Sequence, residues 1–276
     1  MKQVVVITGL GDGMGREVAK MLAASGDSVA GFDVDKKGVA SLEKELSAIG
    51  GDHYLEALDI TDRKGVLRFR NRVLERFNRV DTVLSNVGIG FFSPFEEADL
   101  EKALRCLEIN VIGASAIFQA FLPSMRERRR GKLIAMSSLV GRIPFPFESI
   151  YSASKFAITG LMCSLRYEVE PFGIRVALIE PAQVSTTFAA KIHVLPPEGS
   201  PYRERARRFI DRDDELIKSA PTPEAAAKKI LKVLKAEKPA LFNQVDFMSS
   251  FFLWLNNYLP ARIKDALLVN HMDIKV

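Results

Sequence analysis

Cysteine is scarce in this chain of 276 residues, which contains only Cys106 and Cys163. Two isolated thiols exclude a disulfide framework and a cysteine-based metal site, so we expect no bound metal and a reducing, cytoplasmic location. Uncharged runs long enough to span a membrane are also missing. The first eight residues, MKQVVVIT, lack the long apolar core and the small-residue cleavage site of a signal peptide, and they predict the first strand of a fold instead.

Positive charge is in small excess, because 39 basic and 34 acidic residues give a net charge of +5. The dense basic run from Arg126 to Lys132 contains no aromatic residue that could stack on nucleic-acid bases. We therefore predict no nucleic-acid partner. The run is typical of a solvated helix end, and an anionic partner or a membrane surface is the alternative.

Short apolar runs alternate with longer segments of helical periodicity along most of the chain. Strands are predicted at 3–8, 28–32, 53–58, 80–84, 132–136, 174–179 and 238–242, and helices at 15–24, 36–49, 63–77, 100–125, 151–168, 203–209 and 223–236. This alternation predicts an α/β fold, in which helices cover both faces of a parallel sheet. A ligand then lies at the carboxyl ends of the strands. The stretch 185–220, rich in charge, proline and glycine, is expected to be a long loop around one short helix.

A glycine-rich turn follows the first strand and opens the first helix. It comprises Thr8, Gly9, Gly11, Asp12, Gly13, Met14 and Gly15. Glycines let the backbone turn sharply and approach a pyrophosphate closely, and the helix N-terminus adds free N–H donors and a positive dipole end. The turn therefore predicts a dinucleotide site, with a mobile loop as the alternative.

An acidic residue, Asp33, ends the second strand 18 residues beyond Gly15, where its carboxylate can accept hydrogen bonds from an adenosine ribose. Its charge, together with that of Asp12, would repel a 2′-phosphate, and neither position holds an arginine. NAD is therefore predicted in preference to NADP. Lys36 and Lys37 lie close by and keep NADP open, and a turn or capping role is the alternative for Asp33.

Tyr151 and Lys155 lie four residues apart in a segment of helical periodicity, so they share one face of a helix. Ser138 stands thirteen residues before Tyr151, just past a predicted strand. An acid/base group works best when its pKa is near the operating pH, whereas the pKa of free tyrosine is about 10. An adjacent ammonium and a positive nicotinamide ring would lower that pKa, and Ser138 could hold the substrate oxygen. The three residues predict an acid/base site for an alcohol or ketone, with a surface pair as the alternative.

These motifs together resemble those of the classical short-chain dehydrogenase/reductase family, from residue 1 to about residue 190. The glycine turn has the family's Thr-Gly-x-x-x-Gly-x-Gly spacing. Three further segments resemble segments of the family. The one at Asp59 resembles the segment that contacts adenine, Asn86 to Gly88 resembles the segment after the fourth strand, and Pro181 to Thr186 resembles the segment that embraces the nicotinamide amide. By this resemblance the further cofactor-binding residues are Asp59, Ile60, Asn86, Val87, Gly88, Tyr151, Lys155, Pro181, Val184 and Thr186.

The resemblance also implies a catalytic tetrad: Asn110, Ser138, Tyr151 and Lys155. In the family, the residue matching Asn110 holds a water of the proton relay, and the one matching Lys155 also hydrogen-bonds the nicotinamide ribose. Tyr151 would protonate a carbonyl in reduction or deprotonate an alcohol in oxidation. Ser85 and Ala182 depart from the asparagine and glycine that are usual at their positions, and both are changes between small residues beside the nicotinamide.

The architecture implied by the resemblance is a Rossmann-type, doubly wound parallel sheet of about seven strands. We expect one dinucleotide-binding and catalytic domain over 1–276, with 185–276 as substrate loop and C-terminal extension. Members usually form dimers or tetramers, so a homodimer or homotetramer is expected. The implied activity is hydride transfer between NAD(H) and a secondary alcohol or ketone. An NADP-dependent ketoacyl-type reductase and a non-catalytic, cofactor-binding protein associated with lipid are the alternatives.

Aromatic residues gather where the family places its substrate: Phe91, Phe92, Phe95, Phe145, Phe147 and Phe188. They predict a lipophilic substrate of the steroid, retinoid or fatty-alcohol type, with core packing as the alternative. The segment 245–259 is also rich in aromatic residues. It predicts a peripheral membrane contact through 245–264, in which Arg262 and Lys264 would meet the headgroups. A lid over the substrate pocket and a dimer contact are the alternatives.

Overall fold

The aliphatic and β-branched runs form one sheet of seven parallel strands in the computed structural model, which describes residues 2–186, 188 and 192–275. The strands are β1 Val4–Thr8, β2 Ser28–Asp33, β3 His53–Ala57, β4 Thr82–Ser85, β5 Gly131–Met136, β6 Ile174–Ile179 and β7 Phe242–Asn243. Their order is β3-β2-β1-β4-β5-β6-β7, so the direction of winding reverses between β1 and β4. Such a reversal opens a crevice at the carboxyl ends of the two strands. The predicted Rossmann-type, doubly wound sheet is confirmed.

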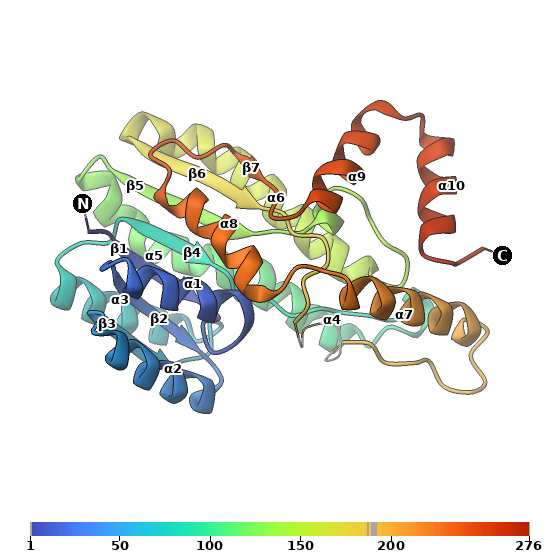
Figure 1. Ribbon diagram of the computed structural model, residues 1–276, viewed down its shortest axis with the longest axis horizontal. Coiled ribbons are helices and arrows are strands. Elements are labelled where there is room, and N and C mark those ends of the chain that lie inside the picture. Colours follow the sequence, from blue (N-terminus) through green and yellow to red (C-terminus); the bar gives the residue numbers. More distant parts are fainter. Residues whose placement is uncertain (1, 187, 189–191, 276) are drawn as a thin grey trace.

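Helices cover both faces of the sheet (Figure 1). They are α1 Gly13–Ala24, α2 Lys36–Ile49, α3 Arg63–Phe77, α4 Leu100–Leu107, α5 Ala114–Glu127, α6 Ser149–Val169, α7 Arg203–Lys218, α8 Pro223–Lys235, α9 Phe247–Tyr258 and α10 Ala261–His271. Helices α1, α2 and α8 pack on one face, and α3, α5 and α6 pack on the other. Helices α7, α9 and α10 lie beyond the carboxyl ends of the strands, with α9 and α10 forming an arch that stands off the body (Figure 1).

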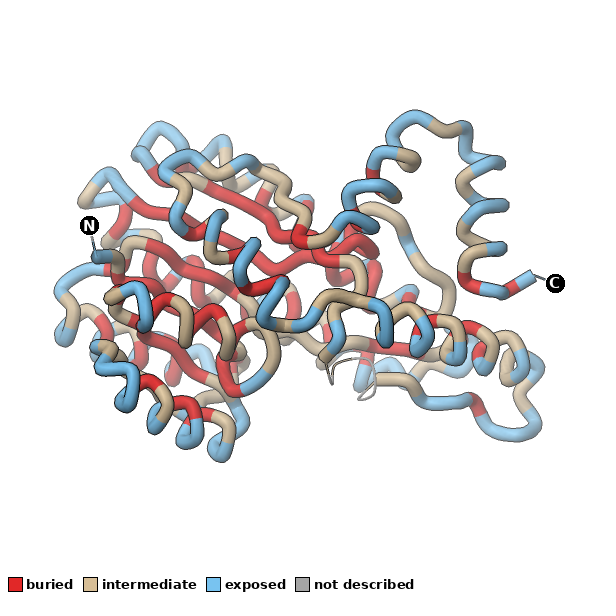
Figure 2. The backbone as a smooth tube through the Cα atoms, in the orientation of Figure 1, coloured by how far each residue is buried: buried red, intermediate tan, exposed pale blue. Residues whose placement is uncertain are grey.

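The core has two halves, one on each face of the sheet. Along β1, Val4 and Val6 belong to the cluster under α3, α5 and α6, whereas Val5 and Ile7 belong to the cluster under α1, α2 and α8. All four side chains are buried, because a parallel strand covered on both faces has no solvated side. Figure 2 shows the result, with the inner strands buried along their whole length and the outer helix faces exposed.

Two strands begin at least two residues later than predicted. Strand β4 begins at Thr82, just after Asp81, whose backbone amide donates to the Val4 carbonyl and whose carbonyl accepts the Lys132 amide, each at 2.9 Å. Strand β7 contains only Phe242 and Asn243, because Pro239 has no backbone N–H to donate to a ladder.

Two helical predictions also need correction. The single helix expected over 100–125 is divided by a π-helical turn, η2 Glu108–Gly113, between α4 and α5. The short helix expected at 203–209 continues to Lys218, because i,i+3 and i,i+4 ion pairs such as Arg207–Asp211 turn a charge-rich stretch into a solvated helix rather than a loop.

One helical stretch, Leu100–Glu127, is long and apolar enough in composition to cross a membrane, although it contains charged residues and is not an uncharged run. Core helices pass the same test. In this stretch 44% of the apolar window is buried, and α5 packs against β4 and β5 of the sheet.

Candidate active site

A cleft with a volume of about 620 Å³ lies at the carboxyl ends of the strands. Its wall includes residues from the glycine turn, from the loops after β4, β5 and β6, and from α6. The predicted residues that line it are Gly9, Asp12, Gly13, Met14, Asp33, Asn86, Val87, Gly88, Ser138, Tyr151, Lys155, Pro181, Val184 and Thr186. The fold therefore brings the predicted cofactor residues and most of the predicted tetrad to one cavity. Thr8, Gly11, Gly15, Asp59, Ile60 and Asn110 lie outside its lining.

The glycine turn has the backbone geometry that its sequence predicts. Gly9 and Gly13 adopt left-handed conformations, with φ of 69° and 57°. A Cβ atom on Gly15 would lie 2.2 Å from the Gly9 carbonyl oxygen, so no larger residue fits there. The Asp12 carboxylate caps α1 by accepting the Gly13 amide at 2.7 Å. The turn thus presents the amino end of α1 to the cleft, which is the arrangement that a pyrophosphate requires.

Asn86 fastens this turn to the end of β4. Its side-chain amide donates to the carbonyl oxygens of Gly9 at 2.7 Å and Thr8 at 3.2 Å. In return, the Thr8 hydroxyl accepts the backbone N–H groups of Asn86 at 3.1 Å and Val87 at 3.2 Å. Thr8 therefore supports the cleft from behind while Asn86 and Val87 form its surface.

Asp33 lies at the other end of the cleft from Tyr151, beside Gly11. One carboxylate oxygen accepts the Gly11 amide at 2.9 Å, and the other accepts the Asp35 amide at 2.9 Å. A carboxylate has about four acceptor positions, so two remain for the hydroxyls of a ribose. These residues fit the adenosine half of a dinucleotide.

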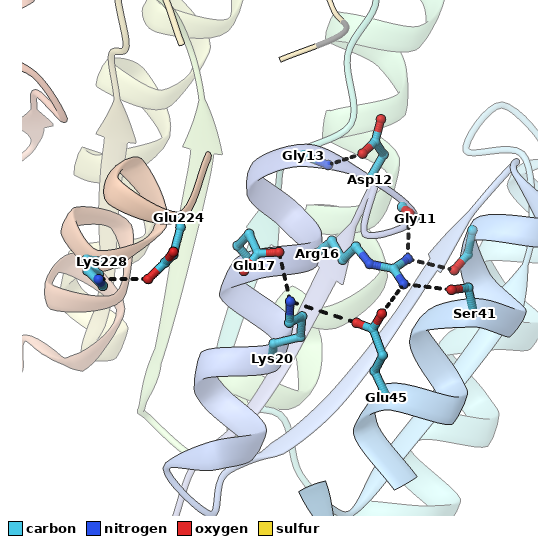
Figure 3. A network of polar contacts seen from close by, with 11 residues as sticks. Gly11, Asp12, Gly13, Arg16, Glu17, Lys20, Ser41, Glu45, Glu224 and Lys228 are labelled. Carbon is cyan, nitrogen blue, oxygen red and sulfur yellow. Dashed lines mark hydrogen bonds and ion pairs between the residues drawn. The ribbon is translucent and has the colours of Figure 1, made fainter. Parts of the chain in front are cut away.

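Arg16 supports the same turn, and its role is not evident from the sequence (Figure 3). Its guanidinium donates to the carbonyl oxygens of Gly11 at 3.0 Å and Gly38 at 3.1 Å. It also donates to the Ser41 hydroxyl and to a Glu45 carboxylate oxygen, each at 2.8 Å. Arg16 therefore holds the turn against α2.

Asp59 and Ile60 are placed behind the cleft rather than in it. The Asp59 carboxylate bonds to Arg105 at 2.5 Å and to the Thr61 hydroxyl at 2.8 Å. Ile60 is buried, and a Cβ atom on Gly113 would lie 2.8 Å from its Cγ2 atom. Both residues tie the loop after β3 to the helices of the opposite face.

The π-helical turn presents Asn110 to the loop after β4. The Asn110 side chain accepts the Ile89 amide and donates to the Ile89 carbonyl, each at 2.8 Å, and it donates to the Ser154 hydroxyl at 3.0 Å. π-Helical turns of this kind are frequent at functional sites. Asn110 thus joins η2, the cleft loop and α6 just behind Gly88.

Ser138, Tyr151 and Lys155 are brought together on the cleft wall, each less than a tenth exposed. The Lys155 ammonium donates to the Met136 carbonyl at 2.9 Å and lies 5.5 Å from the centre of the Tyr151 ring. A Cβ atom on Gly88 would lie 3.4 Å from that ammonium, so the backbone of the loop after β4 passes close to Lys155.

The expected lowering of the tyrosine pKa is not provided by the protein's own groups. Burial raises the pKa of Tyr151, the nearby Glu148 adds to this, and the Ser138 hydroxyl opposes it. Burial also lowers the pKa of Lys155 to about 8. Desolvation therefore has the largest effect on the pKa of both residues. A positively charged nicotinamide ring would act in the opposite direction when bound.

The predicted aromatic pocket divides into two groups. Phe145 and Phe188 line the cleft, and the Phe188 ring lies 5.8 Å from the Tyr151 ring. Phe91, Phe92 and Phe147 pack in adjoining hydrophobic clusters, whereas Phe95 is exposed. Core packing, the stated alternative, therefore accounts for part of the group.

Glu148, Gln183 and Asp213 also line the cleft and were missed by the sequence-based prediction. Glu148 precedes Tyr151 by three residues at the start of α6, and this spacing was a usable signal because residues i and i+3 share a helix face. Asp213 lies on α7, in a stretch taken for a loop, so no signal was available for it.

A family profile described as short chain dehydrogenase matches residues 3–194. Human 17-beta-hydroxysteroid dehydrogenase type 1 is 33% identical over 254 residues, which cover 87% of this chain and 76% of that protein. Mouse dehydrogenase/reductase SDR family member 7B is 31% identical over 262 residues, with 94% and 78% covered. A short-chain dehydrogenase from Streptomyces avermitilis superposes with a TM-score of 0.81 at 28% identity, with 96% and 94% covered. The chain belongs to the short-chain dehydrogenase family of NAD(P)-dependent oxidoreductases.

Proposed function

We propose that the protein transfers a hydride between NAD(H) and a lipophilic secondary alcohol or ketone. The observation that carries this proposal is the shared cleft, which joins the glycine turn and Asp33 at one end to Ser138, Tyr151 and Lys155 at the other. Bound NAD accepts or supplies the hydride at its nicotinamide ring. The cleft residues then have to bind the cofactor, orient the substrate oxygen and move one proton.

Proton movement falls to Tyr151, whose hydroxyl gives a proton to the carbonyl oxygen in reduction and takes it back in oxidation. Ser138 lies close enough to Tyr151 to lower its pKa, so one substrate oxygen can contact both hydroxyls. The Lys155 ammonium has three N–H donors and uses one to bond the Met136 carbonyl. Two donors remain for a ribose and for the developing phenolate. Asn110 links the loop after β4 to α6, because it bonds both Ile89 and Ser154.

NAD is favoured over NADP by the charges around the ribose site. Asp33 presents a carboxylate there, and Arg16, the neighbouring cation, is engaged with Gly11, Gly38, Ser41 and Glu45. A 2′-phosphate would meet negative charge without a free guanidinium to offset it. Solved relatives in complex with NAD and in complex with NADP both superpose on this chain, so the preference rests on these residues.

A lipophilic substrate is favoured by the apolar wall beyond Tyr151. Phe145, Phe188, Val140, Ile192 and Ile217 line that part of the cleft. Burial of apolar substrate surface against such a wall contributes about 25 cal/mol per Å². The human relative is named for a hydroxysteroid, which supports a substrate of the steroid, retinoid or fatty-alcohol type.

The C-terminal arch supports both a substrate role and a membrane role. Helices α9 and α10 enclose a small apolar pocket with Leu139 and Phe145, which also belong to the cleft wall. The outer face of α9 exposes Phe247, Trp254 and Tyr258. We propose that the inner face bounds the substrate site and that the outer face makes peripheral membrane contact.

Apolar residues exposed on α4 and α6 support association of copies of the chain. Leu100 and Leu104 on α4 and Phe156 and Tyr167 on α6 are all exposed. We propose a homodimer or homotetramer that buries these faces, and light scattering on the purified protein measures the mass directly.

A panel of lipophilic and polar alcohols and ketones, assayed with NAD and NADP by absorbance of the reduced cofactor, tests the proposed function. We expect turnover of lipophilic secondary alcohols with NAD and little with sugars. Cofactor binding by calorimetry without turnover of any member would contradict the catalytic proposal.

A further inference from the structure

One ionisable group in the cleft has no place in the hydride-transfer chemistry. Glu148 lies at the start of α6, three residues before Tyr151, and lines the cleft on the substrate side. It is only 8% exposed, and its carboxylate makes no hydrogen bond or ion pair with any residue that the structure describes. A buried carboxyl group without a partner is costly, so such groups normally have one.

A second carboxylate faces the same part of the cleft. Asp213, on α7, is also 8% exposed and lines the cavity. It is held in place, because one oxygen accepts the Gln183 side-chain amide at 3.1 Å and the other lies 3.4 Å from the His193 ring. Glu148 and Asp213 thus line the same cavity, and the negative charge of Asp213 contributes to the raised pKa of Glu148.

The surroundings of this pair supply no cation to neutralise Glu148. Among the described residues that line the cleft, the basic side chain is Lys155, whose ammonium is bonded to Met136. Burial, with a smaller contribution from Asp213, raises the pKa of Glu148 to about 8. The rest of the wall on this side is apolar, with Phe145 and Ile217 beside the two acids.

We propose that Glu148 and Asp213 form an acidic anchor that binds a second hydrogen-bond donor of the substrate, a hydroxyl or an ammonium group close to the reacting carbon. The anchor stands one helical turn from Tyr151, so the donor lies within a few bonds of the carbonyl that is reduced. The apolar wall accepts the remainder of the molecule. This inference rests on the proposed function and adds a specificity requirement to it.

The test uses a matched series of aryl alkyl ketones that carry a methyl, a hydroxyl or an amino group near the carbonyl. Each is reduced with NADH by the wild-type protein, by Glu148→Gln and by Glu127→Gln. The Glu148→Gln substitution keeps the shape of the side chain but removes its ability to ionise, and Glu127 is an exposed carboxylate at the end of α5 that serves as the matched control. Asp213→Asn is a second variant of the anchor.

In the wild type, assayed above the Glu148 pKa of about 8 so that the carboxyl group is ionised, we expect kcat/KM to be at least about tenfold higher for a donor-bearing ketone than for the methyl ketone, as for a hydrogen bond to a charged group. Glu148→Gln should reduce that ratio about tenfold, mainly through KM, while Glu127→Gln leaves it unchanged. A loss confined to the amino ketone identifies an ammonium as the donor, and a loss confined to the hydroxy ketone identifies a hydroxyl. Asp213→Asn should reduce the same ratio.

The anchor is refuted if the wild type shows no preference for either donor, or if the preference survives in Glu148→Gln. The methyl ketone separates this failure from a failure of the proposed function. If the wild type reduces the methyl ketone but shows no preference for a donor-bearing ketone, only the acidic anchor is refuted. If calorimetry shows that NADH binds but no ketone is reduced, the proposed function itself is refuted. Unchanged NADH binding by Glu148→Gln shows that the variant is folded.

Discussion

The Lys155 ammonium lies 5.5 Å from the centre of the Tyr151 ring, and its 2.9 Å hydrogen bond goes to the carbonyl oxygen of Met136. Both side chains are buried, which raises the pKa of the phenol and lowers that of the ammonium to about 8. The protein's own groups therefore favour the protonated phenol. That form is the one required to reduce a ketone, whereas oxidation of an alcohol requires its conjugate base.

Replacement of the phenol oxygen tests the assignment of the acid/base group most directly. Tyr151→Phe should lower kcat by about 10²-fold or more, because general acid–base catalysis contributes roughly that much. NAD binding should stay within about twofold, since only the proton-transferring oxygen is lost. Tyr167→Phe is the matched control, because Tyr167 lies on the same helix and is exposed. Turnover of Tyr151→Phe above a few per cent of the wild-type rate rules out the assignment.

Alcohol oxidation should become faster as the pH rises, because a raised pKa leaves little of the phenol ionised at neutral pH. Lys155→Met removes the neighbouring cation and should move the whole profile to higher pH. The profile is measured as kcat under conditions where a deuterated alcohol shows that hydride transfer limits the rate. A flat wild-type profile under those conditions is incompatible with Tyr151 as the base.

The charge at Asp33 should decide the choice of cofactor. Asp33→Ala combined with Val34→Arg replaces the ribose-binding carboxylate by a guanidinium, because Val34 lines the cleft next to it and is exposed. The ratio of kcat/KM for NADP to that for NAD should rise about tenfold or more, as a bidentate arginine–phosphate contact predicts. An unchanged ratio would show that Asp33 does not contact the ribose.

The glycine turn should tolerate no side chain at its last glycine. A Cβ atom at Gly15 would lie 2.2 Å from the Gly9 carbonyl oxygen and 2.6 Å from the Asn86 amide nitrogen. Gly15→Ala should therefore weaken NAD binding by about tenfold or more, as measured by calorimetry. Gly199→Ala is the control, since a Cβ atom there meets no atom within 4 Å. Equal affinities for both variants would contradict a role of the turn in cofactor binding.

Glu148 should give the free energy of unfolding a distinct pH dependence. Its pKa is raised from 4.5 to about 8 in the folded protein, so the folded state retains a proton that the unfolded state has lost. The resulting stability is fully present below pH 4.5 and is lost as the pH rises to about 8. Each pKa unit corresponds to about 1.4 kcal/mol, so the free energy of unfolding should fall by several kcal/mol across this pH window in the wild type. This decrease should be absent in Glu148→Gln. Urea unfolding at a series of pH values measures it, and identical slopes in both proteins would contradict the raised pKa.

The sheet and the cofactor half of the cleft could be predicted from the sequence because their signals are local. Alternation of apolar and helical segments identifies a parallel sheet, and the spacing from Thr8 to Gly15 identifies the turn. The substrate half depends on contacts between distant segments. Asp213 reaches the cleft through the unexpected length of α7, and Arg16 acts through carbonyl groups and a glutamate on α2. Such contacts leave no periodicity in the sequence.

The fine chemistry of the site was the least predictable part. The spacing of Tyr151 and Lys155 correctly places them on one helix face, but it contains no information on how deeply the two are buried. Burial is set by the loops after β4 and β6, and it reverses the expected effect on the tyrosine pKa.

Leu139 and Phe145 form a partition that belongs to two cavities at once, the cleft on one side and the pocket under α9 and α10 on the other. Changes in the C-terminal helices can therefore reshape the room available to a substrate without moving Ser138, Tyr151 or Lys155. On the proposed substrate role of the arch, exchanging the C-terminal helices α9 and α10 with those of a relative offers a way to change the apolar part of the substrate site while Ser138, Tyr151 and Lys155 stay in place.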